Sequence, residues 1–107
     1  MIQTYLVLAE RIRSELIDLD KLVSRGERAL VASHQHPEDQ DLYIDSAALS
    51  LHDLYSGLER IFRQVAAVVD NNVPSSQEWH RDVLRLMSED IPGVRPVVIS
   101  DASVSAL

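Results

Sequence analysis

A broad apolar stripe between Leu42 and Val69 constrains the fold of this chain more than any other feature. Apolar residues recur there in three rows with a seven-residue step, which places each row along one side of a helix. The rows are Ile44, Leu51, Leu58 and Val65; Ala47, Leu54, Ile61 and Val68; and Ala48, Tyr55, Phe62 and Val69. Asp45, His52 and Glu59 fall outside them. The pattern predicts a long helix that buries one broad side in a helical bundle.

A second heptad pattern begins at Ile2 and predicts another long amphipathic helix, continuing to about Ser33. Its rows are Ile2, Ala9, Leu16, Val23 and Leu30, beside Tyr5, Ile12 and Leu19. Gly26 takes the next position of the second row, where the lack of a side chain predicts a gap or a close approach between helices.

The composition favours an all-α protein. Three glycines, four prolines and few alternating runs in 107 residues give little support for strands. We therefore expect residues 1–107 to form a single domain, an antiparallel helical bundle with three main helices and a truncated fourth.

Charge and cysteine content argue against several classes of function. Without cysteine, neither a disulfide framework nor a thiolate metal site can form. Glu10 and Arg11 interrupt the first apolar run, so we expect no signal peptide or membrane span and a soluble, cytoplasmic protein. With a net charge of −7, the chain does not have the broad basic surface typical of a nucleic-acid binder. Nine arginines could still contact phosphate locally, or form ion pairs on the surface.

The segment around Pro37 predicts a connector between two antiparallel helices, because Pro37 favours a helix start at its own position. His34, His36 and Glu38 are suitable metal donors by residue type. No matching ligands occur elsewhere, so we interpret them as a solvated turn and expect neither a metal site nor a cofactor.

The last third of the chain predicts two further helices. Asp70, Asn71 and Asn72 end the central helix, and Ser75 with Glu78 forms a capping box for the next. That helix carries an apolar face and should stop by Ile91, before Pro92-Gly93. Its apolar face consists of Trp79, Val83, Leu86 and Met87.

After this helix, residues 94–99 predict an extended segment, and Ser100 or Asp101 should cap a short final helix. If no full fourth helix covers the broad stripe, some of its residues should be exposed in a monomer. The residues concerned are Leu54, Leu58, Ile61 and Val65.

Three local strings resemble HepT-like proteins of the HEPN superfamily. Residues 42–62, with Tyr55-Ser-Gly-Leu-Glu-Arg-Ile-Phe62, resemble the second helix of that family. The strings Trp79-His-Arg-Asp-Val-Leu84 and Arg95-Pro-Val-Val-Ile-Ser100 follow in the family's order and spacing.

This resemblance implies an antiparallel bundle that pairs into a homodimer. Related proteins are metal-independent ribonuclease toxins of prokaryotic toxin–antitoxin systems, and their usual partner is a minimal nucleotidyltransferase antitoxin. Their catalytic signature is an Arg followed after four to six residues by a His, on a late helix. There His acts as general acid or base, and Arg stabilises the charged transition state.

That signature is missing where the family keeps it, since no Arg or His follows Arg95. Arg28 and His34 have a matching separation, but they lie at the end of the first helix, and we interpret the spacing as chance. We therefore assign no catalytic residue. The chain is expected to end before the family's catalytic helix.

Five residues are candidates for contacts with RNA or a partner: His80, Arg81, Glu59, Arg60 and Tyr55. His80 has two interpretations. As a functional residue, His80 would transfer a proton or contact a phosphate, aided by Arg81 and the helix N-terminus. As a structural residue, it would form a hydrogen bond within the bundle, beside Trp79. Glu59 is placed to pair with Arg63 at i, i+4.

Three functions remain open from the sequence. The first is a HepT-like domain that dimerises and binds a partner without cleaving RNA. The second is an active ribonuclease toxin whose last helix lies beyond Leu107. The third is a non-catalytic adaptor bundle that reserves the broad stripe for a partner helix.

Overall fold

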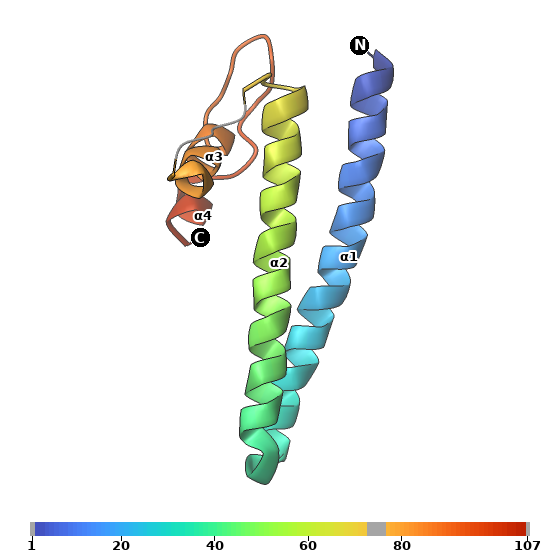
Figure 1. The fold of residues 1–107 in the computed structure, drawn as a ribbon, viewed down its shortest axis with the longest axis vertical. Coiled ribbons are helices and arrows are strands. Elements are labelled where there is room, and N and C mark those ends of the chain that lie inside the picture. Colours follow the sequence, from blue (N-terminus) through green and yellow to red (C-terminus); the bar gives the residue numbers. More distant parts are fainter. Residues whose placement is uncertain (1, 73–76, 107) are drawn as a thin grey trace. The chain divides into compact units, whose positions relative to one another are not determined.

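The computed structural model describes residues 2–72 and 77–106 of the chain. In these two ranges the regular elements are helices, without a strand, which confirms the all-α prediction (Figure 1). The helices are α1 (Ile2–Gln35), the short 3-10 helix η1 (Pro37–Asp39), α2 (Gln40–Val68), α3 (Trp79–Met87) and α4 (Asp101–Ala106). No helix of the described residues is long and apolar enough to cross a membrane.

The chain forms two compact units, and both long helices contribute to each of them. The hairpin unit is Arg11–Leu58, and the terminal unit is Met1–Glu10 together with Glu59–Leu107.

The hairpin unit consists of most of α1 and the first part of α2, joined by η1. Pro37 begins η1, as expected for the connector. Small residues line the helix contact: Ala29, Ser33 and Ser50 are buried. A Cβ atom built on Gly26 would lie 3.6 Å from the Cβ atom of Ser50, an ordinary van der Waals distance, so the two helices do not approach here closely enough to require glycine.

Burial of the broad stripe differs between the units. In the terminal unit, Ile61, Phe62 and Val65 of the stripe are buried together with apolar residues of α3. These side chains form a compact core. The core residues are Leu8, Ile61, Phe62, Val65, Ala66, Val83, Leu84 and Met87. The expectation of exposed Ile61 or Val65 is therefore wrong, and Leu54 and Leu58 are half-buried. Exposed members of the stripe lie instead in the hairpin unit, at Ile44 and Leu51.

The end of α2 follows the prediction from its polar residues. Asn71 adopts a left-handed backbone conformation with φ of 51°, which asparagine tolerates better than most residues. The Asn72 amide then donates to the Ala66 carbonyl at 2.9 Å. The expected Ser75 half of the capping box lies outside the described residues, and Glu78 precedes α3 without a side-chain capping bond.

The third helix ends at Met87, four residues before the expected limit of Ile91. At this end, the Ser88 hydroxyl donates to the Arg85 carbonyl at 2.6 Å and so satisfies one of the last carbonyls of the helix. Leu84 is buried as well, although it was not assigned to the apolar face.

A tight turn follows at Pro92-Gly93. The Val94 amide donates to the Ile91 carbonyl at 3.0 Å, and Gly93 has φ of +78°. Proline followed by a glycine with positive φ is the signature of a type II turn. The amides of Val98 and Ile99 then donate to the Met87 carbonyl, at 2.9 and 3.2 Å, which satisfies an orphan group at the end of α3.

Ser100, one of the two residues predicted as the cap, caps the last helix. Its hydroxyl oxygen accepts the Ser103 amide at 3.1 Å, which is the usual N-cap geometry.

Candidate functional site

Two of the five candidates, Glu59 of α2 and His80 of α3, form a polar contact with each other. The distance between His80 Nδ1 and Glu59 Oε1 is 2.8 Å. The Glu59 side chain is 16% exposed, whereas the His80 side chain is 50% exposed. A largely covered carboxylate therefore holds a histidine ring at the protein surface.

Trp79 and Arg63 complete this cluster in the terminal unit. The rings of Trp79 and His80 stack with centroids 3.5 Å apart and planes inclined by 29°. The Arg63 guanidinium carbon lies 4.6 Å from the Trp79 ring centroid, a cation–π arrangement. Glu59 and Arg63, which the sequence suggested as a surface pair, thus both contact residues of α3, His80 and Trp79 respectively. We call Glu59, Arg63, Trp79 and His80 the α2–α3 cluster.

The hydrogen bond assigns chemistry to the two ring nitrogens of His80. A carboxylate accepts only, so in the neutral ring Nδ1 carries the proton and Nε2 is left as an acceptor. Proteins use this arrangement to orient a histidine for proton transfer or ligand contact. The same bond also ties α3 to α2, which suffices for a structural role.

The other three candidates take no part in the hydrogen bond between Glu59 and His80. Arg81 forms an exposed pair with Glu78 at 3.8 Å, a type of contact that contributes little to stability. Arg60 is exposed on α2. Tyr55 belongs to the hairpin unit and is half-buried, in agreement with its place on the apolar stripe.

The residues weighed as metal donors remain a surface turn. His36 and Glu38 approach to 3.7 Å, with side chains 51% and 69% exposed. Throughout residues 2–72 and 77–106, no group of three or more His, Asp or Glu side chains is arranged to hold a metal ion.

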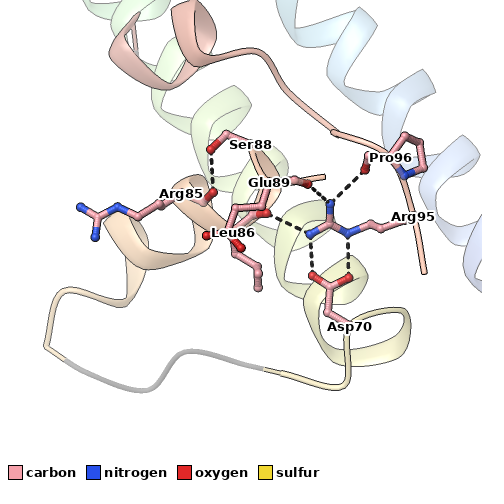
Figure 2. A network of polar contacts seen from close by, with 7 residues as sticks. All are labelled: Asp70, Arg85, Leu86, Ser88, Glu89, Arg95 and Pro96. Carbon is pink, nitrogen blue, oxygen red and sulfur yellow. Dashed lines mark hydrogen bonds and ion pairs between the residues drawn. The ribbon is translucent and has the colours of Figure 1, made fainter. Parts of the chain in front are cut away.

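A buried arginine, Arg95, is the centre of a polar network in the terminal unit (Figure 2). Its Nε and Nη2 atoms donate to the two carboxylate oxygens of Asp70, at 2.7 and 2.6 Å. Nη2 also donates to the Leu86 carbonyl at 2.9 Å. Nη1 donates to the carbonyls of Glu89 and Pro96, at 2.8 and 3.0 Å.

These five bonds match the five N–H groups of a guanidinium. The side chains are 6% exposed for Arg95 and 2% for Asp70, so the pair is removed from water and fully hydrogen-bonded. It joins the end of α2 to the end of α3 and to the segment that leads into α4. This network positions chain segments, and we assign it a structural role.

Sequence reasoning did not find the pairing of Asp70 with Arg95. Twenty-five positions separate them, so no helical spacing connects the two residues. A weak signal existed: Arg95 is the single charged residue in the run from Pro92 to Ser100, and a lone charge among apolar residues requires a partner.

The nuclease signature of the resembled family is absent from α4. Asp101–Ala106 contains neither arginine nor histidine. Arg28 and His34 lie on α1 in the hairpin unit, where both are exposed.

Comparison with known proteins agrees with the resemblance found in the sequence. A family model described as HepT-like protein matches residues 46–107, which is more than half of the chain. This segment includes every residue of the α2–α3 cluster and of the Arg95 network. No curated protein and no solved structure matches the chain. The chain belongs to the HepT-like proteins, a group of the HEPN type.

Proposed function

We propose that residues 1–107 act as a homodimeric HepT-like domain of a prokaryotic toxin–antitoxin system, in the cytoplasm, and do not cleave RNA by the family's usual route. The match of the HepT-like family model to residues 46–107 is the observation that carries this proposal. The lack of Arg and His after Arg95 supports the second part, because the family's chemistry needs both residue types.

Within this proposal, the α2–α3 cluster is the site for contact with RNA or with the antitoxin. Glu59 holds the half-exposed His80 side chain at Nδ1, which leaves Nε2 as an acceptor, and Arg81 adds a positive charge one residue further along α3. Arginine suits phosphate or carboxylate groups of a partner, and the acceptor Nε2 of the neutral histidine suits a hydroxyl or N–H donor. The partner that the family suggests is a minimal nucleotidyltransferase.

Solution mass tests the dimer. Sedimentation equilibrium of the purified chain is expected to give about twice the 12.0 kDa of one chain. A strictly monomeric chain at all concentrations would contradict the dimer.

Co-expression with a small nucleotidyltransferase encoded beside the gene tests the partner. It is expected to yield a complex that His80→Ala weakens, with His52→Ala as the control at an exposed histidine of α2.

A second candidate function is an active ribonuclease whose catalytic helix follows Leu107. The family match favours it, because related proteins keep their signature late in the chain. Reading the coding sequence past Leu107 decides between the two: a helix carrying Arg-x(4–6)-His supports the nuclease, and a stop codon opposes it.

A further inference from the structure

The hydrogen bond between Glu59 and His80 determines which ring nitrogen of His80 changes with pH. Nδ1 lies 2.8 Å from the Glu59 carboxylate, which only accepts, so Nδ1 donates in the neutral ring and in the protonated ring alike. The added proton therefore goes to Nε2, which changes from an acceptor to a donor. Glu59 keeps its bond in both states, so this change requires no rearrangement of the contact between α2 and α3.

Nε2 lies on the part of the ring that Glu59 and Trp79 leave open. Glu59 covers Nδ1, and Trp79 stacks on one ring face with centroids 3.5 Å apart. The side chain is nevertheless half-exposed. This exposure is left to the other ring face and to the ring edges away from Glu59, which include Nε2.

Arg63 adds a permanent positive charge beside the histidine. Its guanidinium carbon lies 4.6 Å from the Trp79 ring centroid, so Arg63 and His80 pack against the same indole. With His80 neutral, the charges of Glu59 and Arg63 cancel. With His80 protonated, the α2–α3 cluster carries one net positive charge and has donors on two side chains.

The other charged side chains of the terminal unit on and just before these helices are of types that keep their charge between about pH 5 and 8 when unperturbed. They are Glu10 on α1, Arg60 on α2, Glu78 before α3, and Arg81, Asp82 and Arg85 on α3. The remaining histidines of the chain, His34, His36 and His52, belong to the hairpin unit. His80 is therefore the side chain of the α2–α3 cluster that responds to pH in this range.

We propose that the proton on Nε2 of His80 controls binding at the α2–α3 cluster: the protonated ring and Arg63 together hold a phosphate group of the partner, and the neutral ring does not. A tetrahedral phosphate can accept from two side chains with separate oxygens, whereas a planar carboxylate is matched by a single guanidinium fork. Binding should therefore strengthen as the pH falls through the range where histidine gains a proton. This inference rests on the proposed function, because it specifies the regulation of the site assigned there to the partner.

Sulfate is a suitable probe, because it has the shape of phosphate and a charge that stays constant in this pH range. Titration of the full chain at constant ionic strength, followed by the side-chain NMR signals of His80 and Trp79, measures its binding. Sulfate is expected to bind at least about fivefold more tightly at about pH 5.5 than at about pH 8.5. Equal binding at both pH values, no binding at about 50 mM sulfate, or tighter binding of acetate than of sulfate overturns the proposal.

A short single-stranded RNA without a terminal phosphate distinguishes the source of the phosphate. The same pH dependence for this RNA supports a backbone diester as the ligand. Binding of sulfate without binding of the RNA supports a free phosphate.

Variants of His80 and Glu59, shown by circular dichroism to be folded, test the role of the proton. His80→Gln supplies an amide donor at every pH and should remove the pH dependence, whereas His52→Gln, at an exposed histidine of the hairpin unit, should keep it. In Glu59→Gln the amide can donate to Nδ1, which allows the neutral ring to carry its proton on Nε2. Binding at high pH should then rise toward its value at low pH.

Glu78→Gln is the matched control for the lost charge, and it should keep the ratio of the two affinities. A pH dependence that persists in His80→Gln, or that is unchanged in Glu59→Gln, overturns the proposal. The proposed function is tested separately, since the dimer mass and the nucleotidyltransferase complex are measured at one pH. A pH-independent sulfate titration beside a dimer and a His80-dependent complex overturns the proton control alone. A pH-dependent titration by a strictly monomeric chain supports the proton control and overturns the dimer.

Discussion

At the scale of single residues, Arg95 shows how this small protein accommodates a buried charge. A buried ion is costly unless its partners replace the lost water, and here Asp70 and three backbone carbonyls do so. The intact pair contributes little net free energy to folding, because desolvation offsets the attraction between the charges. Removing one partner is costly, because the other charge stays buried without a counter-ion.

Asp70→Ala is therefore expected to lower the free energy of unfolding by about 3–5 kcal/mol, because it leaves the Arg95 guanidinium buried without its counter-ion. Arg95→Lys should cost less, since an ammonium keeps the charge and loses the bidentate geometry. Urea denaturation followed by circular dichroism measures both effects. The matched control is Arg81→Ala, which removes an exposed pair and should change stability by less than about 1 kcal/mol. Equal unfolding midpoints for Asp70→Ala and Arg81→Ala would refute the structural role of the pair.

His80 supports a prediction about its tautomer. The Glu59 carboxylate accepts a hydrogen bond from Nδ1, so the neutral ring should carry its proton on Nδ1. Nitrogen chemical shifts of the ring at high pH report the protonated nitrogen directly. Glu59→Ala should remove this preference, and Glu78→Ala, which changes a carboxylate paired with Arg81, should keep it. A proton on Nε2 in the unmodified protein would contradict the geometry.

At the scale of the elements, sequence patterns predicted the helices and missed the contacts between them. The α1 and α2 helices follow from their heptad rows, the connector from Pro37, and the α4 cap from Ser100, because these signals are local. The last carbonyl of α3 accepts the amides of Val98 and Ile99, and the Asp70–Arg95 pair joins two distant segments. Such contacts leave no periodic trace in the sequence.

Substitutions at two glycines distinguish the effect of packing on stability from the effect of backbone conformation. Gly26→Ala is expected to raise the free energy of unfolding by about 0.5–1 kcal/mol, because alanine favours helix and its Cβ atom would make an ordinary contact with Ser50. Gly93→Ala should lower it by about 1–2 kcal/mol, although nothing lies within 4 Å of the added atom, because φ is +78°. Thermal and urea unfolding measure both changes. Changes of the same sign would contradict this explanation.

At the scale of the whole molecule, the family and the fold class were predictable from the sequence, and the candidate site was predictable only in part. The strings around Tyr55, Trp79 and Arg95 carried the resemblance that the family match supports. Glu59 and His80 were both named as candidates, and the structure adds that they contact each other. Their pairing was unpredictable because it depends on how α3 packs against α2.

The HepT-like membership and the lack of Arg and His after Arg95 together support the central proposal, that residues 1–107 do not cleave RNA by the family's usual route. The direct measurement is the amount of RNA cleaved by the purified 107-residue chain, beside a full-length relative that carries Arg-x(4–6)-His. We predict cleavage by the relative and none by this chain. His80→Ala and His52→Ala, purified in the same way, separate a true activity from a contaminant. Robust cleavage by the unmodified chain that His80→Ala abolishes and His52→Ala leaves intact would contradict the claim.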